Sequence, residues 1–399
     1  MSSVVYVAGL GVISAIGNNA AENFASLKNE QAGMGDITLL NTIHKGILPV
    51  AEVKLSNDEL AALTGLPNNI SRTTLLSMVA AKEALEDAAI PGFEGLRSGF
   101  VSANSVGGMD KSEDFFVEFL KDNNKGKLRN VFDHECGSMT EIVADKLGIS
   151  DFMTTVSTAC SSSANAIFYG ARLIKNDMLD VVIAGGTDSL TKFTLNGFNT
   201  LMILDKEFCK PFDEHREGLN LGEGAGYLVL VSEKVAKTLN KQSYCMLSGY
   251  NNSNDAYHQT ASSPDGTGSY LAMQGALKKS GLTPADIDYI NLHGTGTPNN
   301  DSAEGTAIKR LFEPVFPPMS STKSYTGHTL GASGGIEAVY SALAIKNQVI
   351  YPNLRFETRM DELPFEPETE FLSGQDIKHV MSNSFGFGGN CTSLIFSKI

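Results

Sequence analysis

The sequence has few cysteines, few basic residues and no long apolar run, and each shortage excludes a class of protein. Its five Cys (Cys136, Cys160, Cys209, Cys245 and Cys391) include no CxxC pair, which argues against a disulfide framework and a zinc site. No apolar run reaches the roughly eighteen residues that a membrane span needs. The apolar N-terminus also lacks the Lys or Arg of a signal peptide. We therefore expect a cytoplasmic protein without a metal site or membrane contact.

Basic residues are outnumbered by acidic ones. The chain has 31 Lys and Arg against 45 Asp and Glu, a formal net charge of −14, which disfavours general nucleic-acid binding. Two glycine-rich stretches lack the spacing of a nucleotide site. Gly9-Leu10-Gly11 does not continue as GxGxxG, and residues 211–226 contain no Lys-Ser/Thr pair after their glycines. We expect no nucleic-acid partner and no cofactor.

The sequence contains no linker that would divide it into separate domains. Short apolar segments alternate with amphipathic ones such as 73–89, a pattern typical of α/β proteins. The predicted strands include 4–8, 99–104, 179–184, 227–232, 379–385 and 391–396. We expect Gly185-Gly186 to end the strand at 179–184, and the turn GFGGN to join the last two strands as a hairpin. The chain is predicted to be one α/β unit of two fused halves.

The stretch from Val156 to Asn176 combines a strand end, a turn of small residues and a helix. Residues 151–158 are rich in Thr and Val, and apolar residues then recur at helical spacing from Ala164. Cys160 is therefore predicted at the helix N-terminus, where the helix dipole favours a thiolate. The alternative is a buried Cys that packs as a small hydrophobe.

Three further segments place reactive groups beside glycines. His293 lies in HGTGT, His328 lies in TGHTLGASGG, and GFGG spans residues 386–389. Glycine lets the backbone approach a ligand closely, and the N–H groups of GFGG suit an oxyanion site. A single His is as often structural as catalytic, and GFGG alone is equally typical of an ordinary hairpin.

Two helices have similar ends. YGARLIKN (169–176) and YSALAIKN (340–347) match at five of eight positions, at a constant offset of 171 residues. Both helices also begin with small residues beside a reactive side chain. Two pseudo-equivalent halves, each sending one buried helix to a shared centre, would explain this repeat.

Taken together, these motifs resemble the β-ketoacyl-acyl carrier protein synthases of the elongating type, which belong to the thiolase-like superfamily. The matching pieces are TACSSS around Cys160, PFD..REG..LGEGAG, HGTGTP, K....GH.LGASGG..A and NSFGFGG, and they cover nearly the whole chain. The resemblance implies a thiolase-like fold, five-layered α-β-α-β-α, built from two pseudo-equivalent halves at 1–243 and 244–399. It also implies a decarboxylative Claisen condensation with malonyl-acyl carrier protein.

The resemblance further implies a role for each matching residue. Cys160 would take the acyl chain as a thioester. His293 and His328 would hydrogen-bond the malonyl thioester carbonyl and stabilise the enolate, and Lys323 would support the second His electrostatically. The backbone N–H groups of Cys160 and Phe387 would form the oxyanion hole, with Phe387 also gating the pocket. Support is expected from Glu337, Thr295 and Thr297.

Some positions depart from the family pattern. Glu217-Gly218-Leu219 replaces the usual Asp-Gly-Phe, Asn390-Cys391 replaces Thr-Asn, and basic residues are sparse beside Arg72. These changes leave the acyl-chain preference open and fit a specialised polyene or polyketide pathway as well as fatty acid synthesis. The family's partners are acyl and malonyl thioesters and an acidic carrier protein, and its members are usually homodimers, although a heterodimer is an alternative. The residues expected to dock the carrier protein are Lys125, Lys127, Arg129 and Arg72, the first three lying in a basic run that is alternatively an ordinary solvated loop.

Two rival functions remain open at this point. A thiolase uses a second Cys as a base, normally just ahead of a glycine run, whereas Cys391 follows GFGG. A non-catalytic subunit similar to a chain-length factor would lack the nucleophile, and Cys160 argues against that reading.

Overall fold

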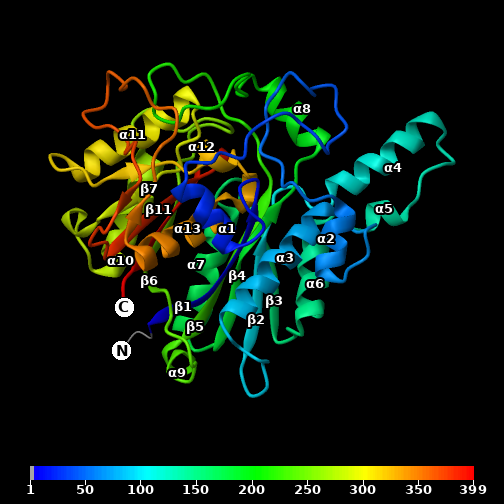
Figure 1. The fold of residues 1–399 in the computed structure, drawn as a ribbon, viewed down its shortest axis with the longest axis horizontal. Helices are drawn as coiled ribbons and strands as arrows, with labels where there is room; N and C mark the ends of the chain where they lie inside the picture. The colour runs from blue at the N-terminus through cyan, green and yellow to red at the C-terminus, as the bar shows by residue number, and fades with distance from the viewer. Residues whose placement is uncertain (1–3) are drawn as a thin grey trace.

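The computed structural model describes residues 4–399, and one ten-stranded mixed sheet runs through the chain (Figure 1). Its strand order is β3-β2-β4-β5-β1-β6-β12-β11-β7-β8. These strands are β1 (Val5–Ser14), β2 (Ser98–Ala103), β3 (Phe152–Val156), β4 (Val181–Asp188), β5 (Gly224–Ser232), β6 (Cys245–Asn254), β7 (Tyr289–Asn291), β8 (Met319–Ser320), β11 (His379–Phe385) and β12 (Asn390–Ser397). A small separate sheet pairs β9 (Val349–Ile350) with β10 (Leu372–Ser373).

The two halves of the large sheet have the same topology. In the first half β2 pairs in parallel with β3 and β4, and β5 and β1 follow antiparallel. In the second half β7 pairs in parallel with β8 and β11, and β12 and β6 follow antiparallel. The halves meet in a short ladder between β1 and β6, where Tyr6 pairs with Met246. The predicted pseudo-equivalent halves are therefore confirmed, as is the hairpin of β11 and β12.

Helices form three layers around the two halves of the sheet. The central layer consists of α7 (Ser162–Lys175) and α13 (Ser333–Asn347), which pack on each other and on strands of both halves. The outer layers contain α3 (Arg72–Asp87) and α6 (Cys136–Leu147) on one side, and α10 (Thr267–Ser280) and α11 (Pro298–Phe312) on the other. This arrangement is the predicted α-β-α-β-α order, with the largest apolar core around α7 and α13.

Glycine allows the central helix α13 to lie directly on the sheet. A Cβ added to Gly335 would come within 2.4 Å of the carbonyl oxygen of Gly226 on β5, and one added to Gly185 would come within 2.0 Å of the same atom. Because these glycines serve close packing, β4 continues through Gly185-Gly186 to Asp188. The prediction that the two glycines end this strand is therefore wrong.

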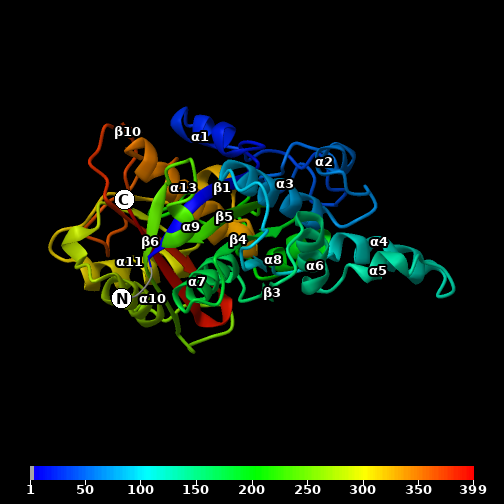
Figure 2. The same ribbon diagram turned by 90° about the horizontal axis from the view of Figure 1, so that it is seen from below.

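One pair of helices projects from the body of the molecule (Figures 1 and 2). Every side chain of α4 (Met109–Lys121) and α5 (Arg129–Phe132) is at least partly exposed, including Phe116, Leu120 and Phe132. We call residues 109–132 the α4–α5 hairpin. The remaining helices are α1 (Ala20–Lys28), α2 (Asn57–Thr64), α8 (Lys192–Thr200), α9 (Glu233–Ala236) and α12 (Lys323–Thr326), with 3₁₀ turns at Pro284–Asp286, Leu330–Ala332 and Phe387–Gly389. Within residues 4–399, no helix has the length and apolar character needed to cross a bilayer.

Candidate active site

Cys160 lies in the tight turn between β3 and α7. Ala159 adopts a left-handed conformation (φ 53°), and Ser161 is the N-cap of α7. The turn is fixed by its hydroxyl groups: Ser162 Oγ accepts the Thr158 N–H at 2.8 Å and donates to the Ala159 carbonyl at 2.5 Å. The predicted strand, turn and helix around Cys160 are therefore confirmed, and the turn holds its sulfur in a buried position.

The surroundings of Cys160 favour the thiol in the resting protein. Burial raises the pKa of the Cys160 thiol to about 11, against the opposing effects of the Phe387 N–H, the Lys323 ammonium and its own N–H. Desolvation therefore outweighs the favourable groups around the sulfur. The helix N-terminus was expected to favour the thiolate; the N–H groups at the turn do lower the pKa, but burial raises it further, so the net shift is opposite to the expected one.

Two histidines converge on this sulfur from the second half of the chain. His293 follows β7 and His328 follows α12, and both are buried. Cys160 Sγ and one ring nitrogen of each His lie within 4.8 Å of one another. The two imidazole rings are edge-on, at 87° and with centroids 5.5 Å apart. The structure thus brings Cys160 together with two His that follow it by 133 and 168 residues in the sequence.

The hydrogen bonds of the two imidazoles fix which ring nitrogen is protonated. His328 Nδ1 accepts the Leu330 N–H at 3.0 Å, so its proton resides on Nε2. His293 Nδ1 lies 3.3 Å from the Lys323 ammonium, which donates, so Nε2 again holds the proton. Burial, together with the Lys323 charge, keeps the pKa of both His well below the usual range. Both are therefore neutral imidazoles with one N–H to donate.

Lys323 is buried and supports His293 directly. Its Nζ donates to the His293 carbonyl at 2.6 Å and forms an ion pair with Glu337 of α13. The resemblance implies that Lys323 supports His328 electrostatically, and the Lys323 charge does act on His328, where it lowers the pKa. The hydrogen bonds of Lys323, which the resemblance did not imply, reach His293.

Two carboxylates of α11 hold the loop that contains His293, and neither is among the residues predicted from the sequence. Glu304 accepts the N–H groups of His293 (2.9 Å) and Gly294 (2.8 Å), and Asp301 accepts that of Thr295 (3.0 Å). Burial raises the pKa of Glu304 to about 7. The available signal was the i, i+3 pair of acidic residues on a helix that begins at Pro298, directly after HGTGT.

Phe387 separates two cavities that meet at Cys160. A cavity of about 240 Å³ is lined by both His and by Thr295 and Thr297, whose hydroxyls lie 2.9 Å apart. The other cavity, of about 330 Å³, is mainly apolar. Its lining includes Val106, Phe193, Leu201 and Leu330. The Phe387 ring stacks on Phe198 of α8, with centroids 5.9 Å apart, and this aromatic pair lines both cavities.

The two departures from the family pattern near the C-terminus have different roles. The Asn390 side-chain oxygen accepts hydrogen bonds from Ser161 (2.8 Å), Asn165 (2.8 Å) and Asn252 (2.7 Å), and so ties the nucleophile turn to the GFGG turn. Cys391 points into the outer core beside Ser269. It therefore cannot act as the second Cys of a thiolase.

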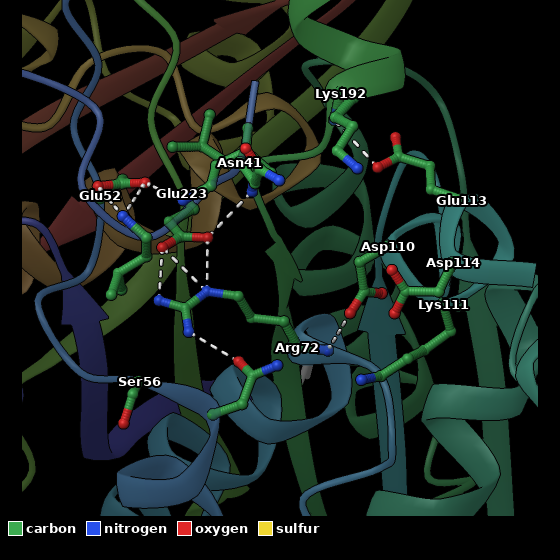
Figure 3. A pocket seen from close by; sticks show the side chains of 14 residues that line it. Asn41, Glu52, Ser56, Arg72, Asp110, Lys111, Glu113, Asp114, Lys192 and Glu223 are labelled. Atoms are coloured by element: carbon green, nitrogen blue, oxygen red, sulfur yellow. Dashed lines mark hydrogen bonds and ion pairs between the residues drawn. The ribbon is translucent and has the colours of Figure 1, made fainter. Parts of the chain in front are cut away.

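The expected docking residues are separated by the fold. Arg72 is buried at the start of α3, and its guanidinium bonds both carboxylate oxygens of Glu223 (Figure 3). The guanidinium also donates to the Val53 carbonyl. The prediction that Arg72 helps to dock a partner is wrong, because these buried bonds leave its charge neutralised. The residues that are exposed, on the α4–α5 hairpin, are Lys125, Lys127 and Arg129.

Comparisons with known families agree with this geometry. Residues 2–236 match the model described as "Beta-ketoacyl synthase, N-terminal domain", and residues 244–357 match "Beta-ketoacyl synthase, C-terminal domain". The chain belongs to the beta-ketoacyl synthase family. It is an acyl-transferring synthase with the thiolase-like fold.

Individual relatives match the synthase over its full length. The 3-oxoacyl-[acyl-carrier-protein] synthase 2 of Staphylococcus aureus is 33% identical over 410 residues, which cover 99% of this chain and 98% of the relative. The ishigamide ketosynthase/chain length factor structure has a TM-score of 0.95 at 27% identity, covering all of both chains. A type II polyketide ketosynthase solved with its acyl carrier protein has a TM-score of 0.88 at 25% identity, also covering all of both chains.

Proposed function

We propose that the synthase extends an acyl chain, held as a thioester on Cys160, by decarboxylative condensation with malonyl-acyl carrier protein. The observation that supports this assignment is the convergence of one buried sulfur and two neutral imidazoles at the junction of two cavities. In this arrangement the apolar cavity takes the acyl chain, and the cavity lined by His293 and His328 takes the malonyl group. Phe387 acts as the gate between them.

In the first step, the sulfur of Cys160 attacks the carbonyl carbon of the incoming acyl thioester. The backbone N–H groups of Cys160 and Phe387 lie beside the sulfur, and they donate to the oxyanion that develops. The carbon–sulfur bond to the donor then breaks, and the donor thiolate takes up the proton that Cys160 has lost. Covalent capture divides a difficult condensation into two easier steps.

In the second step, the malonyl group loses carbon dioxide and its bonding electrons form an enolate. His293 and His328 each donate an Nε2–H to the enolate oxygen, while Lys323 holds His293 in place. Thr295, Thr297 and Glu337 support the loop and the lysine. The enolate carbon attacks the Cys160 thioester, and the tetrahedral intermediate expels the Cys160 thiolate, which regains a proton from solvent. The product is a β-ketoacyl chain on the carrier protein.

The carrier protein docks, in this proposal, on the α4–α5 hairpin. Lys125, Lys127 and Arg129 give this hairpin an exposed basic segment on a chain whose net charge is −14, and such a patch attracts an acidic partner. A structural relative was solved as a ketosynthase with its acyl carrier protein. Arg72 takes no part in this surface.

We further propose that the synthase acts as a dimer of two chains, each divided into halves at 1–243 and 244–399. β3 is an edge strand with Met153 exposed, and the hairpin exposes Phe116, Leu120 and Phe132 nearby in sequence. Exposed edges and apolar patches of this kind favour association. A homodimer is expected, and the alternative is a heterodimer with a chain length factor, as named for one relative. Native mass spectrometry of the purified chain distinguishes the two.

Variants of the two histidines test whether acylation of Cys160 and decarboxylation of the malonyl group depend on different residues. His293→Ala and His328→Ala should still form the acyl-enzyme on Cys160, because acylation depends on the sulfur and the two backbone N–H groups. Loss of one positioned donor should reduce decarboxylation by about a hundred- to a thousandfold. The measurement pairs labelled acyl transfer to the protein with labelled carbon dioxide released from malonyl carrier protein. Normal decarboxylation in either variant, with no acylation, would show that this His is instead the base for Cys160.

A further inference from the structure

The helix α8 connects the α4–α5 hairpin to the gate at the active site. α8 begins at Lys192, after the N-cap Thr191, and contains Phe198 near its other end. Helix α4 packs on α8, although α4 belongs to the hairpin that projects from the molecule (Figure 1). A change in the position of α4 can therefore reach α8 through direct contact.

Glu113 of α4 caps the N-terminus of α8. Its Oε1 accepts the Phe193 N–H at 2.6 Å. Its Oε2 accepts the Lys192 N–H at 3.3 Å (Figure 3). The first N–H groups of a helix have no partner within the helix, and Thr191 satisfies only that of Thr194. A carboxylate at this end also interacts favourably with the helix dipole. Glu113 thus completes a cap from a helix about 80 residues away.

The other end of α8 forms the wall between the two cavities. Phe198 stacks almost parallel to Phe387, at 14°, and both rings line both cavities at Cys160. A long acyl chain has to pass this pair to enter the apolar cavity. An acetyl group is short enough to remain at the sulfur. The position of Phe198 should therefore affect long chains more than short ones.

We propose that Glu113 is a positioning residue that acts through α8 and Phe198 on the acyl gate at Phe387, and so links the α4–α5 hairpin to acyl-chain selection. The proposal rests on the function proposed above, in which Phe387 is the gate. Glu113 itself touches neither substrate nor Cys160. Glu113 holds the first turn of α8 in place, and thereby the position of the Phe198 ring that lines both cavities.

The test measures acylation of Cys160 by acetyl-CoA and decanoyl-CoA, followed by intact-protein mass spectrometry. These small donors avoid any effect on carrier docking. Glu113→Ala should lower the decanoyl rate about fivefold, the effect expected from losing one helix cap, and change the acetyl rate less than about twofold. Glu113→Gln keeps an oxygen acceptor for the Phe193 N–H and should stay within about twofold of the wild type. Should Glu113→Ala not fold, Glu113→Asp retracts the carboxylate and should show the same selective loss.

Two controls separate this role from a general loss of structure. Glu118→Ala removes an exposed carboxylate from the same helix, and it should leave the decanoyl-to-acetyl ratio unchanged. In a Phe198→Ala background, Glu113→Ala should no longer change that ratio, because the Phe198 ring through which Glu113 acts on Phe387 is already absent. A ratio at or above the wild-type value in folded Glu113→Ala overturns the proposal, as does a repeated fivefold loss in the Phe198→Ala background. Failure of the wild type to acquire any acyl group would instead overturn the proposed function.

Discussion

The buried ion pair between Lys323 and Glu337 makes a quantitative prediction about stability. Both side chains are almost fully buried, at 2% and 3% exposure, so neither charge has water to compensate for a lost partner. Removing one member of such a pair typically costs about 3–5 kcal/mol. We expect Lys323→Met and Glu337→Gln each to lower the free energy of unfolding by that amount, whereas the double variant should lose less than the sum by about 2 kcal/mol or more.

The pH dependence of Lys323→Met follows from the same pair. Burial raises the pKa of Glu337 to about 7 from its usual 4.5, even with the ammonium opposing it, and removal of Lys323 raises it further. The folded variant then binds this proton more tightly than the unfolded chain does. It should therefore be most stable at low pH, and should lose stability as the pH rises from about 4.5 through the folded pKa. Its deficit relative to the wild type should be larger at pH 8 than at pH 5.

Urea unfolding followed by two probes, with reversibility checked, measures these free energies. Lys278→Met is a matched control, because Lys278 is exposed on α10, and a surface change of this kind should cost less than about 0.5 kcal/mol. Additive losses in the double variant, or a deficit independent of pH, would refute the reasoning. Lys323→Met should also reduce decarboxylation as His293→Ala does, because its hydrogen bonds reach His293.

Four further predictions concern the nucleophile, the docking surface and metals. Alkylation of Cys160 by iodoacetamide should accelerate about tenfold per pH unit from pH 7 to 10, since its pKa is raised to about 11; a plateau below pH 8 would contradict the dominance of burial. Cys160→Ala should abolish condensation yet retain the thermal unfolding temperature, because Ala fits the turn. Reversing Lys125, Lys127 and Arg129 to Glu should raise KM for carrier-bound substrate and spare acyl-CoA; equal losses on both would indicate a damaged fold. Dialysis against EDTA should leave activity unchanged, and a loss restored by zinc would show that Cys160 and the two His bind metal.

Local sequence was sufficient for the elements that present the reactive groups. The turn at Cys160, the helix after it and the hairpin of β11 and β12 depend on small residues, helical spacing and glycine, which act over a few positions. The repeat at 169–176 and 340–347 likewise predicted the two halves, because equivalent helices occupy equivalent sites in the core. By contrast, the prediction that Gly185-Gly186 ends a strand is wrong, because the sequence of β4 does not show how closely it packs against β5.

The sequence by itself determined the family, the fold and the identity of Cys160, His293 and His328 as candidate residues, because these depend on motifs that are contiguous along the chain. Only the tertiary structure decided their burial, their hydrogen-bond partners and their pKa shifts. It buried Arg72 against Glu223, directed Lys323 to His293 and placed Glu113 on α8. It also raised the pKa of the Cys160 thiol, because burial outweighs the Lys323 charge and the N–H groups of Phe387 and Cys160. Hydrogen bonds and desolvation depend on distances between segments far apart in sequence, and those distances are set only when the chain packs.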